Sequence, residues 1–287
     1  MTHQIGFDNG GWNRELAGFW IAKYEMSMET DGISTKTSSS TIGNVATNDK
    51  IKIVSKPNVS SWRYINIANC YTNSYHYDRK KESHLMKNSE WGACAYLTHS
   101  QYGRNRNEVT INNSNNYITG SAESIVAGNS TTYAYNTEAG MLASSTGNIY
   151  GVYDLSGGAY EYVASFNSAY SGAYYTDSAY LDSNGNHFAI TGGSSTKYIT
   201  VYNNNTSTSY GNFSVGRVSI PGDAIKEVWV SSDRAWFYDY SHFIYKSNPF
   251  FRYGGMYSSA TSAGIFCSYS TNGGTYGGYS FRVVLAD

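Results

Sequence analysis

The sequence of 287 residues has few charged residues, few prolines and no long apolar run. Charged side chains make up only 14% of the chain and the formal net charge is −1, so no long-range field attracts nucleic acid or an anionic membrane. No apolar segment approaches the length of a transmembrane helix, and the first residues show no signal-peptide pattern. The composition therefore predicts a partner other than nucleic acid and no insertion into a membrane.

Cysteine is also scarce, and catalytic motifs are missing. Cys70, Cys94 and Cys267 cannot all pair within one chain, and their spacing fits neither a zinc site nor a C-x-x-C redox pair. The six histidines form no metal-binding motif, and neither a serine-nucleophile elbow nor a phosphate-binding loop occurs. We therefore expect Cys70 and Cys94 to be small core residues on helices, and the motifs predict no cofactor.

Tyrosine and glycine are abundant, with 29 residues of each. Together with many Asn, Ser and Thr residues, they predict a surface that makes contacts through neutral hydrogen bonds and aromatic area, as antibody loops do. These residue types dominate the stretches 29–50, 100–146 and 164–220, which we expect to be loops. No repeat or interdomain linker is visible, so the sequence predicts one domain over 18–287 after a loose arm over 1–17.

Local patterns predict a mixed α+β fold with two helices. Residues 18–28 alternate as a strand does, and the apolar end of the chain at 281–285 predicts a strand that pairs inside a sheet. A first helix is expected to begin after a cap at Ser60 or Ser61, and a second helix is expected over about 87–102. Both helices precede a long half of the chain that is rich in strand-forming residues.

The most informative stretch is 147–163. Gly157 and Gly158 lie between two runs of apolar and aromatic residues, a pattern that predicts a tight turn, because glycine adopts positive φ without a Cβ clash. Glu161 follows between two tyrosines, so its carboxylate must either face solvent or find buried donors.

This stretch resembles the signature N-x-x-G-L-x-D-M-x-G-N-V-W-E-W of the formylglycine-generating-enzyme (sulfatase-modifying factor) domain, a variant of the C-type lectin fold. Gly158 stands where the family has asparagine, and Tyr160 and Tyr162 replace its tryptophans. The signature positions that match are Asn148, Gly151, Tyr153, Asp154, Leu155, Gly157 and Glu161. Other stretches that resemble the family, in its order, are 18–27, 89–96, 253–257 and 280–284.

The resemblance implies a particular architecture. It predicts a single α+β domain with a C-type lectin-like fold of the formylglycine-generating-enzyme type, which has two helices, short antiparallel strands and long loops. Trp91 and Tyr160 match aromatic framework positions of the family. We therefore expect both side chains to be buried in one core.

The resemblance also bears on metals and catalysis. The family binds structural calcium partly at the glycine turn, where Asn148, Asp154 and Glu161 could supply oxygens. Its enzymes hold copper with two cysteines near the carboxyl end, but here the residue five positions before Cys267 is Ser262, and one thiol cannot form the two-sulfur site. We predict no catalytic residues and no resident metal. Calcium at the turn stays an open alternative, as does an oxygen- or metal-dependent protein-modifying enzyme with unusual residues.

A second branch of this fold comprises the variable proteins of diversity-generating retroelements, found in phages and bacteria. Their codons vary just before the final strand and yield mainly Tyr, Ser, Asn, Thr, Ala, Gly, Asp and Cys, which is close to the composition of residues 253–279. The resemblance implies a non-catalytic, extracellular receptor-binding protein on a phage tail or bacterial cell surface. Its partner would be a protein or glycan of a target cell. A structural decoration domain without a ligand is a third interpretation.

Tyrosine offers a large, rigid contact area and a hydroxyl at low entropic cost, so tyrosines define the expected ligand surface. At least two of the tyrosines in the closing segment should expose ring area together, because few apolar neighbours could bury all of them. The predicted ligand-binding residues are Trp236, Tyr238, Tyr240, Tyr253, Tyr257, Ser258, Ser259, Thr261, Ser268, Tyr269, Asn272, Thr275, Tyr276 and Tyr279.

Overall fold

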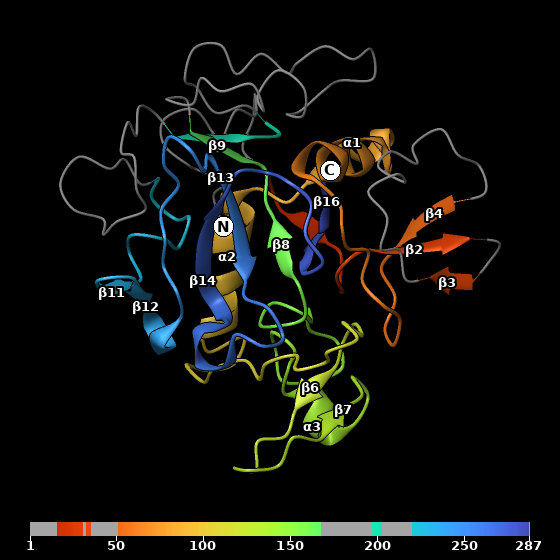
Figure 1. The fold of residues 1–287 in the computed structure, drawn as a ribbon, viewed down its shortest axis with the longest axis vertical. Helices are drawn as coiled ribbons and strands as arrows, with labels where there is room; N and C mark the ends of the chain where they lie inside the picture. Colours follow the sequence, from red (N-terminus) through yellow and green to blue (C-terminus); the bar gives the residue numbers. More distant parts are fainter. Residues whose placement is uncertain (1–15, 31–32, 36–50, 168–196, 203–219, 287) are drawn as a thin grey trace.

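The chain forms an α+β fold in which short strands make up several small sheets (Figure 1). Within the described residues, no helix is both long enough and apolar enough to cross a membrane. The computed structural model describes residues 16–30, 33–35, 51–167, 197–202 and 220–286. The helices in these ranges are α1 (Ile67–His76), α2 (Asn88–His99) and α3 (Glu138–Met141), with short 3₁₀ turns η2 (Arg79–Lys81), η3 (Trp236–Tyr238) and η4 (Ala260–Ser262).

A four-stranded sheet lies at the centre of the molecule (Figure 1). Its strand order is β14 (Gly264–Thr271), β13 (Phe250–Gly254), β8 (Tyr160–Tyr162) and β15 (Tyr279–Phe281). β13 is antiparallel to both of its neighbours, whereas β15 runs parallel to β8. The sheet therefore brings the 160–162 stretch directly beside two segments from the carboxyl-terminal part of the chain.

The carboxyl-terminal strand occupies the middle of a second sheet, which confirms the prediction for residues 281–285. β16 (Val283–Ala286) lies between β1 (Phe19–Ile21) and β5 (His84–Leu85), antiparallel to both. The remaining pairings are β2 (Ser27–Thr30) with β3 (Ile33–Thr35) and β4 (Ile51–Val54), β6 (Ala122–Glu123) with β7 (Thr132–Tyr133), β9 (Ser165–Asn167) with β10 (Thr200–Tyr202), and β11 (Trp229–Ser231) with β12 (Arg234–Ala235).

The prediction of one strand over 18–28 is wrong, because this segment splits between two sheets. β1 pairs with β16, and β2 pairs with β3 and β4. The segment between β1 and β2 contacts the carboxyl-terminal segment, because the amides of Ala22 and Met26 donate to the carbonyls of Val283 and Phe281. Trp20 points away from the core and is 70% exposed.

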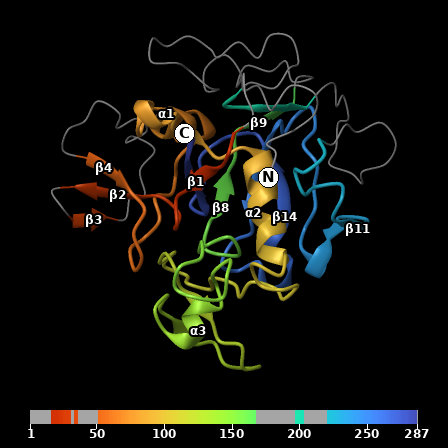
Figure 2. The same ribbon diagram turned by 180° about the vertical axis from the view of Figure 1, so that it is seen from behind.

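Helix α2 agrees with the helix predicted over about 87–102. The Glu90 carboxylate accepts a hydrogen bond from the Lys87 amide and caps the first turn. Figure 2 shows α2 in front of β14 when the molecule is viewed from behind. Trp91 fixes this contact, because its ring stacks on Tyr253 at 5.0 Å and its indole N–H donates to the carbonyl of Ile265.

Helix α1 begins later than predicted, so the cap assigned to Ser60 or Ser61 is wrong. Tyr64 has a φ of 58°, a left-handed conformation that a continuous helix cannot contain. The helix begins only after this residue, and the Asn66 side chain caps it by accepting from the Asn69 amide at 2.8 Å. Cys70 is buried on α1 and Cys94 is half-buried on α2, in agreement with the expectation for both.

The predicted loop over 100–146 contains the small elements β6, β7 and α3. The other predicted loops, over 29–50 and 164–220, fall partly outside the described residues, as does most of the predicted arm over 1–17.

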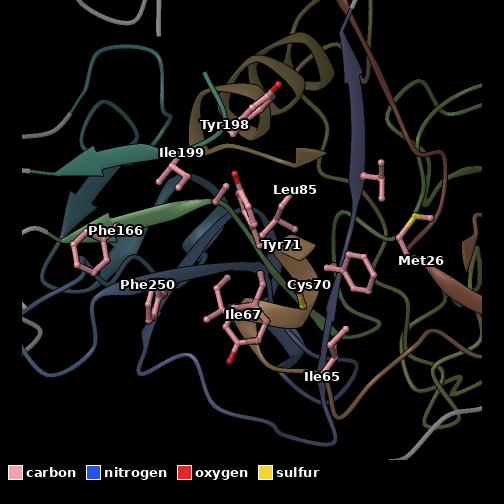
Figure 3. Close-up of a cluster of buried hydrophobic side chains, with 14 of the residues drawn as sticks. Met26, Ile65, Ile67, Cys70, Tyr71, Leu85, Phe166, Tyr198, Ile199 and Phe250 are labelled. Carbon is pink, nitrogen blue, oxygen red and sulfur yellow. The ribbon is translucent and has the colours of Figure 1, made fainter. Parts of the chain in front are cut away.

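Two hydrophobic clusters pack on opposite faces of the central sheet. One contains Phe250, Tyr162 and Phe281 from the sheet together with Ile67 and Tyr71 of α1 (Figure 3). The other contains Tyr253 and Phe251 from the sheet together with Trp91 of α2. Because side chains alternate along a strand, each helix covers its own face of the sheet.

Trp91 and Tyr160 are both buried, as predicted, with 1% and 8% of their surface exposed. The expectation that they share one core is wrong. Tyr253, on which Trp91 stacks, is registered opposite Glu161, so the neighbouring Tyr160 points to the other face of the sheet.

Replacing Trp91 by alanine should lower the free energy of unfolding by about 3–5 kcal/mol, because the change leaves a large cavity between α2 and the central sheet. Urea unfolding of Trp91→Ala measures this loss. Trp20→Ala, which removes a 70% exposed ring, is the matched control and should change stability by less than about 0.5 kcal/mol. Equal stabilities for the two variants would contradict the packing described for α2.

Candidate ligand-binding surface

The glycine turn that precedes β8 brings together segments that are far apart in the sequence. Gly157 and Gly158 have φ values of 75° and 68°, as the prediction of a tight turn requires. The carbonyl of Gly158 accepts from the Tyr257 amide, so the turn holds the start of the closing segment. A Cβ at position 158 would lie 2.7 Å from a carboxylate oxygen of Glu25, which explains glycine at this position in this chain.

Glu161 finds buried donors instead of solvent, which resolves the alternative left open by the sequence. Its carboxylate receives two hydrogen bonds from the Arg282 guanidinium, at 2.9 and 2.5 Å, and both side chains are almost fully buried. The same guanidinium donates to the carbonyls of Ala22 and Tyr153. This ion pair ties β8 to three other parts of the chain.

Two more buried carboxylates lie around this ion pair. Asp154 accepts from the side chain of Asn112 and the amide of Gly120, both at 2.8 Å. Glu25 accepts from the amide of Ala159. Burial, together with the nearby carboxylates of Asp154 and Glu161, raises the pKa of Glu25 well above its usual range.

The three residues considered for calcium do not fit a cation site in this arrangement. Glu161 is held by Arg282, and Asp154 is held by amide donors. The Asn148 side-chain oxygen accepts from the Tyr150 amide. Among the described residues, no group of three or more His, Cys, Asp or Glu side chains is placed to hold a metal ion.

The face of the central sheet opposite to Glu161 carries tyrosines around one arginine. Arg252 is registered between Tyr162 on β8 and Tyr269 on β14, so these side chains share a face. Its guanidinium carbon lies 4.2, 4.6 and 4.4 Å from the ring centres of Tyr160, Tyr269 and Tyr279. At such distances each ring face attracts the cation.

The aromatic contacts continue from β14 to the turn η3. The rings of Tyr240 and Tyr269 lie 6.1 Å apart. The Arg234 guanidinium lies 4.1 Å from the ring of Tyr240 and 4.3 Å from that of Tyr238. Tyr238 is 61% exposed and has a φ of 74°, a conformation that is costly for tyrosine and that recurs at binding sites.

In the other direction the contacts reach the tip of the closing segment. The rings of Tyr276 and Tyr279 are 5.0 Å apart, and Tyr276 is 53% exposed. We call the continuous set the tyrosine–arginine band. It consists of Tyr238, Arg234, Tyr240, Tyr269, Arg252, Tyr160, Tyr279 and Tyr276.

An open pocket adjoins the band at its Tyr276 end. It has a volume of about 440 Å³, and every side chain that lines it is uncharged. Such a volume lies within the range of small-ligand sites. The lining residues are Asn66, Asn272, Gly273, Gly274, Thr275, Tyr276 and Tyr279.

The structure sorts the predicted ligand residues into three groups, which are buried, exposed and half-buried. Tyr253 and Ser268 are fully buried, so their assignment to the ligand surface is wrong: both face the α2 side of the central sheet. The exposed residues are Tyr238, Ser258, Thr261, Asn272, Thr275 and Tyr276. The half-buried residues are Trp236, Tyr240, Tyr257, Ser259, Tyr269 and Tyr279.

The arginines were missed by the sequence analysis, as was Tyr160 as a member of the surface. Arg252 sits within an aromatic strand, and its contacts come from β8, β14 and β15, which no local pattern brings together. Strand alternation could have indicated the position of Arg252. If Tyr253 had been predicted to be buried, the neighbouring Arg252 would have been expected on the opposite face of the strand.

Comparison of the sequence with models of known protein families finds no match. Comparison with curated protein sequences also finds no match.

Replacing Glu25 by glutamine should reduce the loss of stability on going from about pH 5 to about pH 8. The folded protein holds the Glu25 proton more tightly than the unfolded chain does, since the pKa is raised on folding. Its contribution to stability is therefore present below the unfolded pKa and is lost as pH rises through the folded pKa. Glutamine keeps an oxygen for the Ala159 amide and has no proton to lose.

Urea unfolding of Glu25→Gln and the unmodified protein at both pH values measures this effect. Glu138→Gln is the control, because Glu138 is exposed at the start of α3 and should leave the pH dependence unchanged. An unaltered pH dependence in Glu25→Gln would show that Glu25 does not hold a proton in the folded state.

Proposed function

We propose that this protein is a non-catalytic binding module that recognises its ligand through the tyrosine–arginine band. The observation that carries the proposal is the continuity of the band, in which ring–ring and ring–arginine contacts connect Tyr238 to Tyr276. Tyrosine and arginine are the residue types that concentrate binding energy at protein surfaces. The band therefore has the chemistry of a recognition surface.

The setting of the band supports the same proposal. Tyr160 and Arg252 lie on strands of the central sheet, whose other face is packed against α2, so their positions are fixed before a ligand arrives. Tyr276 lies on the loop between β14 and β15 and is more accessible. A rigid base with accessible aromatic tips lowers the entropic cost of binding.

We further propose that the domain has the C-type lectin-like fold of the formylglycine-generating-enzyme type, in the branch of diversified variable proteins. This rests on the sequence resemblance, and the α+β architecture is compatible with it. The natural location is then extracellular, on a phage tail or a bacterial surface. The flanking DNA tests this assignment. We expect a near-copy of codons 253–282 beside a reverse-transcriptase gene, and its absence would refute the assignment to the diversified variable proteins.

The environment of Cys267 favours binding over the enzymatic alternative. Its side chain is fully buried, and burial raises the pKa of its thiol, whereas a copper ligand must be a thiolate. Ser262, at the position of the family's other cysteine, lies in η4. These two positions together do not offer the sulfur pair that the copper chemistry uses.

Replacing Tyr238 and Tyr276 together by alanine should weaken binding to target cells by about tenfold or more, because truncated aromatic anchors commonly cost over 1 kcal/mol each. Unfolding free energy should change by less than about 1 kcal/mol, as for surface sites. Both quantities are measured on the same double variant. Tyr102→Ala with Tyr150→Ala removes two other exposed tyrosines, 76% and 88% accessible, and should bind as the unmodified protein does.

Candidate target cells come from a screen of the unmodified protein against bacterial surfaces. Cell binding that survives the loss of Tyr238 and Tyr276 would refute the band as the recognition surface. A collapse of stability in the double variant would instead assign the two rings to the framework.

Incubation with copper, oxygen, a reductant and a sulfatase-type cysteine peptide should yield no aldehyde product. Mass spectrometry of the peptide measures the outcome, with a known formylglycine-generating enzyme as positive control. Aldehyde formation that disappears in Cys267→Ser would establish the enzymatic function and exclude the proposal of a purely binding role.

A further inference from the structure

Arg252 differs from Arg234, the other arginine of the band, in its partners. Arg234 lies 3.8 Å from the Asp233 carboxylate, whereas Arg252 forms no ion pair with any residue that the structure describes. Among the described residues, its guanidinium lies against tyrosine rings, and its Nε is buried without a hydrogen-bond partner. The guanidinium is therefore largely removed from water with neutral neighbours around it.

A desolvated cation of this kind is costly unless an anion joins it. Three ring faces compensate in part, since each attracts the cation by only about 0.5–2 kcal/mol. Burial lowers the pKa of Arg252, and the neighbouring tyrosines Tyr160, Tyr162 and Tyr269 oppose this effect only in part. A ligand anion would supply the partner that the described residues do not.

A second arginine of this type flanks the same loop. Arg63 donates to the carbonyl of Gly277 at 2.6 Å, and its guanidinium lies 4.0 Å from the ring of Tyr117. It too forms no ion pair within the described ranges, and its Nε is buried without a partner among them. The Tyr276–Tyr279 loop thus lies between two arginines that lack carboxylate partners in the described part of the chain.

The pocket at the Tyr276 end of the band indicates the kind of molecule to which such an anionic group would belong. Asn66 and Asn272 use their side-chain oxygens to accept from backbone amides, which leaves their NH₂ groups to donate. Tyr276 and Tyr279 offer ring faces against which the C–H face of a sugar can pack. Tyr279 lines the pocket and also belongs to the ring cluster around Arg252, so one side chain separates the pocket from the guanidinium.

We propose that the ligand of this surface is an acidic saccharide, whose sugar ring occupies the 440 Å³ pocket and whose carboxylate pairs with Arg252. The proposal rests on the binding function argued above and specifies its ligand class. The planar guanidinium matches a carboxylate through two parallel hydrogen bonds. Neutral amides, hydroxyls and rings match the remainder of a sugar.

The test measures binding of sialyllactose and oligogalacturonate beside their neutral counterparts, lactose and the methyl ester of the oligogalacturonate. The acidic members should bind the unmodified protein about tenfold or more tightly than the neutral ones, because a desolvated charge pair forms only with them. Arg252→Gln should abolish this difference. Lys52→Gln, which removes the same charge from the exposed surface of β4, should retain it.

A second variant keeps the test decisive should Arg252→Gln fold poorly. Asn272→Ala changes an exposed pocket residue and should weaken acidic and neutral sugars alike. Equal binding of acidic and neutral sugars by the unmodified protein would overturn the proposal. So would competition by a polyglutamate peptide with no binding of acidic sugars, which would assign the anion to a protein.

The outcome also separates this inference from the proposed function. If Tyr238→Ala with Tyr276→Ala abolishes cell binding while no acidic sugar binds, the surface recognises a different ligand and only the saccharide proposal fails. If the double variant keeps its cell binding, the band itself is not the recognition surface and both proposals fail.

Discussion

The structure depends on one buried ion pair, between Glu161 on β8 and Arg282 at the start of the last strand. Each partner alone would be an uncompensated charge in the interior, so removing either is expected to be far more disruptive than removing both. Arg282 also donates to the carbonyl of Ala22, directly after β1, and to that of Tyr153, in the segment before the glycine turn. The ion pair therefore holds together β8, the segment before β16, the end of β1 and the segment before the glycine turn.

The ion pair also determines which face of the central sheet each neighbouring side chain occupies. Glu161 faces the α2 side of the central sheet, and strand alternation then directs Tyr160 to the opposite face. The pairing of β13 with β8 extends this rule to the neighbouring strand, where Tyr253 shares the face of Glu161 and Arg252 shares the face of Tyr162. The arrangement of the tyrosine–arginine band is thus a consequence of how the interior is arranged.

Sequence patterns predicted the features that depend on local chemistry. These include α2 with buried Trp91, the positive φ of Gly157 and Gly158, and the pairing of the final strand. The start of α1 was mispredicted because Tyr64 adopts a left-handed conformation that no composition signal marks. For the site, tyrosine content indicated the closing segment, but it could not separate buried Tyr253 from its accessible neighbours. The arginines were missed because their contacts come from strands that are distant in sequence.

The charges of Arg282 and Arg252 have different surroundings. Arg282 is fully buried; it donates two hydrogen bonds to the Glu161 carboxylate, which balances its charge, and it also donates to two backbone carbonyls. Arg252 is surrounded by three tyrosine rings, and no carboxylate approaches it in the described part of the chain. A residue needed only for packing could be apolar at lower cost, since burying a cation without an anion is unfavourable. The charge at position 252 therefore has no balancing carboxylate among the described residues, and this is the observation from which we propose an external anion.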